Sequence, residues 1–191
     1  IKRNFNLFGE SSRSSSGGIA HLHGMMASLH PRLSLSMIYR NYDRNYHSAY
    51  ANAFSESSRP NNESGLFTGL QFKLNNHWEV SSYFDQFTFP WMRYQVDKPN
   101  SNGMDGFIQV LYHPTKKLNI YARVRHRIKP YNESMTQSRD ITNVFNTNQW
   151  NYRLNFNVLI TESIRLRNRL EYVNYQRTGN DLEQGILIVQ D

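Results

Sequence analysis

Apolar and polar side chains alternate along much of this chain. Between residues 150 and 160 every second position holds a large apolar side chain, namely Trp150, Tyr152, Leu154, Phe156, Val158 and Ile160. The positions between them hold mainly Asn and Arg. Because successive side chains of a β-strand point to opposite faces of a sheet, this pattern predicts a strand with one apolar and one polar face. A shift of one residue would turn the polar side chains onto the apolar face, so the pattern also fixes the register.

The same alternation recurs along the chain and predicts about ten strands. It is clear at residues 33–40, 66–74, 118–125, 150–160 and 164–171, and weaker at 1–8, 18–29, 78–88, 104–112 and 184–190. A tilted strand crosses a bilayer in about 9 to 11 residues, whereas soluble strands most often have about 5 or 6. The lengths of the predicted strands therefore favour strands that cross a membrane.

The segments that join these strands alternate between short and long. Short ones lie at residues 30–32, 75–77, 113–117 and 161–163, and long polar ones lie at 9–17, 43–64, 89–103 and 129–147. Outer-membrane barrels have short turns at the periplasmic end and longer loops outside. The predicted fold class is therefore an all-β, antiparallel, up-and-down transmembrane β-barrel, or about ten strands of a larger one. Residues 1–191 are expected to form a single barrel segment that continues beyond both ends.

Aromatic side chains lie where such a barrel would meet the two membrane surfaces. Trp78 and Tyr112 flank short turns, and Tyr39, Trp150 and Tyr172 lie near long connections. Trp and Tyr favour this zone because the ring can sit in lipid while its polar atom stays in water. Their positions support the membrane interpretation.

The composition is compatible with a barrel but not with helical membrane spans. Only 38% of the residues are hydrophobic, mean hydropathy is -0.70, and no stretch approaches the about 20 consecutive apolar residues of a spanning helix. A barrel strand needs apolar side chains at alternate positions only. The absence of Cys excludes disulfides and thiolate metal sites within this sequence.

A sheet in a membrane cannot leave its edges open, because unpaired backbone groups find no water in hydrocarbon. The first and last predicted strands must therefore pair with each other or with strands outside this sequence. The second arrangement is favoured, because the closing strand of a bacterial barrel commonly ends in an aromatic residue and residues 187–191 contain none.

Basic side chains alternate along several predicted strands and would share the polar face. They are Arg123, Arg125, Arg127, Arg153, Arg165, Arg167 and Arg169. In one interpretation these arginines line the lumen and form salt bridges with acids such as Glu79, Asp85 and Glu171. In the other they attract an anionic ligand, in agreement with the net charge of +7. Acidic partners within reach of every arginine would favour the first interpretation.

Other candidates for chemistry are sparse. An apolar insert is predicted to form a contact patch at the barrel mouth and consists of Phe89, Trp91, Met92 and Tyr94. His21 and His23 share one strand face, but the sequence offers no third metal ligand. It contains no phosphate-binding glycine loop, nucleophile elbow or zinc-binding helix motif. We therefore predict no catalytic, metal-binding or cofactor-binding residue.

Several short segments resemble an outer-membrane barrel family of Bacteroidetes-type bacteria. They are NLFGESS at residues 6–12, YRNY at 39–42, SESS at 55–58 and RVRHR at 123–127. Members of that family often carry a helix-hairpin-helix segment, similar to competence DNA-binding proteins, ahead of the barrel. The resemblance implies an outer-membrane location and a barrel fold. It transfers DNA binding to no residue of this chain, so nucleic acid is not an expected partner.

The expected function is that of a non-enzymatic, porin-like outer-membrane barrel in transport, in channel formation or in surface assembly. Its partners would be outer-membrane lipid, the missing strands of the same barrel and an anionic ligand. The residues expected to face lipid are Leu70, Phe72, Leu118, Ile120, Leu154, Phe156 and Val158. Two alternatives remain open: an outer-membrane enzyme with a Ser–His site at the loop end, and a soluble lipocalin-like barrel with an apolar interior.

Overall fold

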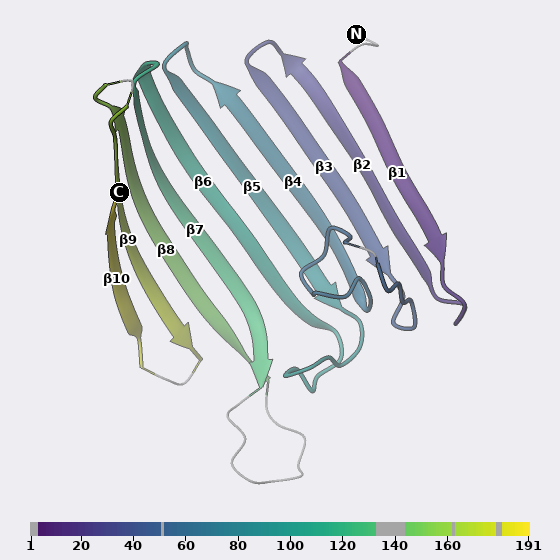
Figure 1. Ribbon diagram of the computed structural model, residues 1–191. Coiled ribbons are helices and arrows are strands. Elements are labelled where there is room, and N and C mark those ends of the chain that lie inside the picture. Colours follow the sequence, from purple (N-terminus) through teal and green to yellow (C-terminus); the bar gives the residue numbers. More distant parts are fainter. Residues whose placement is uncertain (1–3, 51, 133–143, 162, 179–180) are drawn as a thin grey trace.

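The computed structural model describes residues 4–50, 52–132, 144–161, 163–178 and 181–191. These residues form one ten-stranded antiparallel sheet in which every strand pairs with the next along the chain (Figure 1). The strands are β1 (Phe5–Arg13), β2 (Ile19–His30), β3 (Leu33–Tyr42), β4 (Glu63–Lys73), β5 (Trp78–Phe89), β6 (Ser101–Thr115), β7 (Leu118–Asn132), β8 (Val144–Leu159), β9 (Arg165–Arg177) and β10 (Glu183–Gln190). The prediction of an all-β, antiparallel, up-and-down sheet is confirmed. Among the described residues, no helix is long and apolar enough to cross a membrane.

The predicted long connection at residues 9–17 is wrong. Strand β1 continues to Arg13, which pairs with Ile19 of β2, and the chain reverses in a tight turn. In that turn the Ser14 N–H donates to the Gly18 carbonyl at 2.9 Å, and Gly17 has a φ of 86°, a conformation that favours glycine. Polar composition hid this strand, because ladder hydrogen bonds to β2 do not require apolar side chains.

Other strands also extend beyond their predicted boundaries. Residues 129–132 belong to β7 and residues 144–147 to β8, so part of the predicted connection at 129–147 is strand. The remainder, 133–143, lies outside the described residues, as do residues 1–3 of the first predicted strand. Strand β6 reaches Thr115 through a register shift after Tyr112, and only Lys116 and Lys117 join it to β7.

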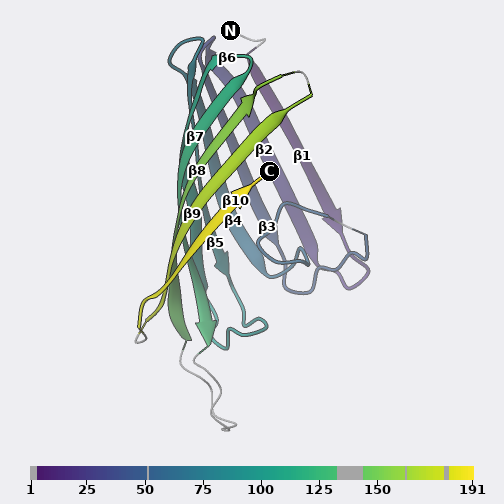
Figure 2. The same cartoon turned by 60° about the vertical axis from the view of Figure 1, so that its left-hand side comes forward.

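The sheet curls into an open trough (Figures 1 and 2). Among the described residues, β1 pairs only with β2 and β10 only with β9, so the sheet is not closed. The connections β2–β3, β4–β5, β6–β7 and β8–β9 lie at one end, here called the turn end (Figure 1). The opposite end, the loop end, carries the segment 43–62, whose described residues, 43–50 and 52–62, fold in front of β3, β4 and β5 (Figure 1).

The register separates the sheet into an apolar face and a polar face. One row of directly opposed apolar residues crosses seven strands: Phe72, Val80, Val110, Ala122, Leu154, Leu170 and Ile188. The neighbouring row on the other face consists of Gln71, Ser81, Gln109, Arg123, Arg153, Glu171 and Leu187. Many side chains of the apolar face are exposed, with Ile108 at 61% and Leu154 at 49%. Several of the buried residues are polar or charged.

Candidate functional site

The arginines singled out in the sequence all lie on the polar face. Arg123 stands directly opposite Arg153, and Arg153 stands opposite Glu171. The other members of the row alternate with the apolar positions on the same strands. Every residue expected to face lipid lies on the opposite, apolar face. The register shows this directly for four of them, since Leu118 pairs with Val158 and Ile120 pairs with Phe156.

A cluster of buried charges that the sequence did not predict lies at the loop end. Arg40 of β3 donates from Nε to Glu63 of β4 at 2.6 Å. It also donates from both terminal nitrogens to the two carboxylate oxygens of Asp85 on β5, at 2.8 and 3.1 Å. Arg40 and Glu63 are completely buried and Asp85 nearly so. Buried charges of this kind are tolerated when geometry and hydrogen bonding compensate them.

Segment 43–62 completes the shell around this cluster. The Phe54 ring lies 5.1 Å from the Arg40 guanidinium carbon and packs edge-on against Phe67 of β4 at 5.3 Å. The backbone N–H of Glu56 donates to Glu63 at 3.0 Å, and the Glu56 carboxylate pairs with Lys129 of β7 at 2.5 Å. The segment therefore reaches from β3 across the trough to β7.

A second ionic group lies further along the polar face, around Asp105 of β6. Arg125 and Arg127 both donate to its carboxylate, the latter at 2.9 and 3.0 Å. The hydroxyl of Tyr83 also donates to Asp105, at 3.2 Å. One carboxylate therefore serves two members of the predicted arginine row.

Arg153 and Arg123 have separate partners. Arg153 donates to both oxygens of Glu171 at 3.0 and 3.1 Å. Arg123 donates to the side-chain oxygen of Gln109 at 2.9 and 2.6 Å, and its guanidinium lies 4.8 Å from the centre of the Phe107 ring. The predicted counter-charges Glu171 and Asp85 are in ion pairs, whereas Glu79 accepts a hydrogen bond from Gln71 at 2.7 Å.

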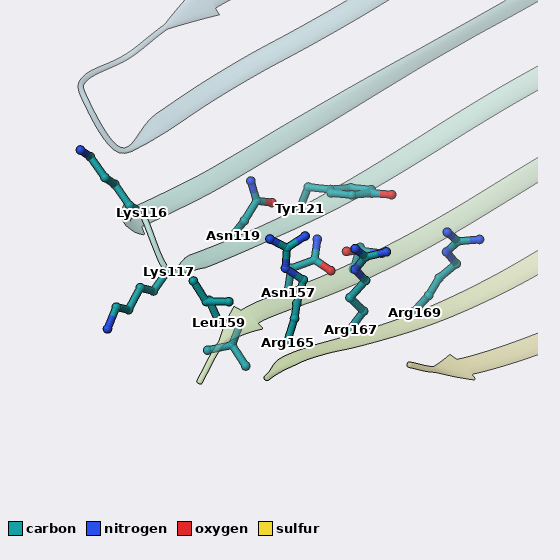
Figure 3. A pocket seen from close by; sticks show the side chains of 11 residues that line it. Lys116, Lys117, Asn119, Tyr121, Asn157, Leu159, Arg165, Arg167 and Arg169 are labelled. Carbon is teal, nitrogen blue, oxygen red and sulfur yellow. The ribbon is translucent and has the colours of Figure 1, made fainter. Parts of the chain in front are cut away.

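The last members of the row, Arg165, Arg167 and Arg169, lie on β9 near the turn end and border a groove of about 470 Å³. Figure 3 shows their guanidinium groups side by side on one side of the sheet, with Asn157 and Tyr121 beside them. Lys116 and Lys117 also line the groove, and none of its lining residues is acidic. Ion pairs thus hold one part of the arginine row but not this part, within the described residues.

The predicted mouth patch is partly wrong. Phe89 is 1% exposed, because the Arg93 guanidinium covers its ring at 3.9 Å, so it offers no surface to a partner. Trp91, Met92 and Tyr94 are exposed, Tyr94 at 87%. Burial lowers the pKa of the Arg93 guanidinium from its usual value, and the carboxylates of Glu63 and Glu56 oppose that shift.

A Ser–His pair lies on the apolar face at the loop end. The Ser11 hydroxyl is 2.8 Å from Nδ1 of His21, and Asn41 stands opposite His21 in the register. The rings of His21 and His23 stack at 5.9 Å. In the described part of the chain, no group of three or more His, Cys, Asp or Glu side chains could hold a metal ion.

No family model, curated protein or solved structure matches the chain.

Proposed function

We propose that this chain forms part of the wall of an outer-membrane β-barrel and has a non-enzymatic role in transport, channel formation or surface assembly. Its apolar face contacts lipid, and its polar, arginine-rich face lines a water-filled lumen. The strands that close the barrel come from elsewhere in the same protein, because open edges are not tolerated in hydrocarbon.

The observation that carries this proposal is the inverted distribution of side chains between the two faces. Ile108, Leu154 and their neighbours are exposed over several strands, whereas Arg40, Glu63 and Asp105 are buried on the other face. Water-soluble monomers rarely expose contiguous apolar patches larger than a few hundred Å². A lipocalin-like barrel needs an apolar interior, and the described polar face instead carries ion pairs.

Strand length and aromatic placement also support a membrane. Strands β6 and β7 have 15 residues each and β8 has 16, enough to cross a bilayer and extend beyond it. At the turn end Trp78 packs on Tyr112 at 4.4 Å, and towards the loop end Trp150 stacks on His126 at 3.9 Å. Both pairs lie on the apolar face, where an interfacial aromatic belt would lie.

The test is to refold the full protein in detergent and in liposomes. A barrel should migrate differently on SDS gels before and after boiling, and its strands should resist added protease in liposomes. A protein that remains a soluble monomer without detergent would contradict the proposal.

A specific observation favours one second candidate, an acyl hydrolase. Ser11 and His21 are within hydrogen-bond distance at the loop end. The serine oxygen would attack an ester carbonyl carbon while its proton passes to His21 and then to the leaving alkoxide.

This candidate predicts that a fluorophosphonate probe labels the protein, with labelling lost in Ser11→Ala. The matched control is Ser12→Ala, because that hydroxyl bonds Tyr46 on the opposite face. Labelling that persists in Ser11→Ala, or never occurs, contradicts it.

A further inference from the structure

The polar face of β9 carries a run of three arginines, Arg165, Arg167 and Arg169, that are in no ion pair within the described residues. The nearby Glu171 is held by Arg153. Asp191 is joined to Arg167 by two backbone hydrogen bonds of 2.9 Å. Three other members of the row, Arg125, Arg127 and Arg153, are in ion pairs with Asp105 or Glu171. Arg123 is held by the neutral side chain of Gln109.

The side chains of β9 and its neighbours line a groove near the turn end. The three arginines alternate along β9, so adjacent members are separated by about 7 Å along the strand. Figure 3 shows their guanidinium groups in a row above β8, whereas the Lys116 and Lys117 ammonium groups point away from one another at the turn end. At about 470 Å³ the groove falls within the range of small-molecule sites, roughly 300 to 1,000 Å³.

Two amides of β8 provide independent evidence for a missing partner. The side-chain oxygens of Asn155 and Asn157 are buried and have no hydrogen-bond partner in the described part of the chain. Both side chains line the groove, and Asn155 is only 7% exposed. Leaving a buried polar atom unpaired costs free energy. A terminal amide can turn over and exchange its oxygen and nitrogen, so each can present an N–H donor to an anion.

We propose that this groove binds a phosphorylated solute with at least two phosphate groups. Guanidinium groups match phosphate with paired, charge-assisted hydrogen bonds. Their spacing along β9 suits successive anionic groups better than a single one. Binding also relieves repulsion among three like charges that are in no ion pair within the described residues. The inference deepens the proposed function and rests on it for the aqueous lumen that lets the solute enter.

The test measures binding of tripolyphosphate and of orthophosphate to the full protein in detergent, by calorimetry at constant ionic strength. We expect tripolyphosphate to bind more tightly than orthophosphate. The triple variant Arg165→Gln/Arg167→Gln/Arg169→Gln should weaken tripolyphosphate binding by at least about tenfold, because it removes several charged hydrogen bonds. Asn155→Leu, a single change that retains every charge, should weaken it too.

The matched control removes the same amount of charge at the loop end, through Arg13→Gln/Arg59→Gln/Lys98→Gln, at exposed positions. This control should bind tripolyphosphate as the parent does. Equal losses in the two triple variants, or no loss in the β9 variant, overturn the inference. Binding of a single-stranded oligonucleotide without binding of tripolyphosphate overturns it as well.

Gel mobility before and after boiling separates the two proposals. A barrel that folds and resists protease but does not bind tripolyphosphate contradicts the phosphate site alone. A chain that never shows barrel behaviour contradicts the proposed function itself.

Discussion

Arg40 on β3 reaches across the intervening strand β4 to form a two-pronged ion pair with Asp85 on β5. The residue beneath the guanidinium is Gly65, the cross-strand partner of Arg40. A Cβ added at Gly65 would lie 2.6 Å from the guanidinium carbon. The small residue on β4 therefore creates the space through which two strands that are not neighbours are linked by charge.

Arg40→Met should destabilise the protein strongly. It leaves the buried Glu63 and Asp85 carboxylates without their cation, and breaking such a pair typically costs about 3 to 5 kcal/mol. The measurement is the free energy of unfolding in urea, with the protein in lipid vesicles. Arg167→Met is the control. Since Arg167 has no acidic side-chain partner among the described residues, its loss should cost under about 1 kcal/mol. Similar losses in both variants would contradict this account of the cluster.

Gly65→Ala should lower the same free energy by about 1 to 3 kcal/mol, because the added methyl group displaces the Arg40 guanidinium. Gly185 on β10 offers a matched comparison. A Cβ there meets nothing within 4 Å, so Gly185→Ala should leave stability unchanged or raise it slightly. The expectation fails if the two alanine variants are equally stable.

Alternation of side chains was sufficient to predict which residues share a face. Leu154, Arg153 and their counterparts lie on the expected sides because each strand has a period of two. The Arg40 cluster could not be predicted in this way, because its partners come from three strands and from a long connection. Asp105 was equally hidden in a weakly alternating strand, although its register position opposite Arg127 would have indicated an ion pair. Phe89 was taken for a surface residue because no sequence pattern shows that Arg93 folds back over it.

Asp105→Asn should increase the anion preference of any conductance through the barrel. The carboxylate neutralises part of the charge of Arg125 and Arg127, and removing it leaves the lumen more positive. The measurement is the reversal potential in a planar bilayer under a salt gradient. Asp181→Asn, an exposed change between β9 and β10, should cause a smaller shift. A shift of equal size or opposite sign for Asp105→Asn would count against a lumen on this face.

Leu154→Arg should cost about 2 to 4 kcal/mol of folding stability in lipid, because it places a charge near the middle of the apolar face. Ser34→Arg introduces the same side chain on the polar face, opposite Gln71, and should be tolerated. The two variants are compared by their folding yield in liposomes and by their free energy of unfolding in urea. Equal penalties at the two positions would show that the faces do not differ in their surroundings.

The most direct measurement of the central claim is a scan of single cysteines along β8. The chain contains no Cys, so each residue from 151 to 157 can be replaced in turn and spin-labelled, with any cysteine elsewhere in the full protein removed. In liposomes, labels at residues 152, 154 and 156 should be accessible to oxygen dissolved in lipid, and labels at 151, 153, 155 and 157 to a water-soluble nickel complex. Access of the nickel complex to both sets, or a pattern with the opposite phase, would contradict an apolar face in lipid and a polar face in water.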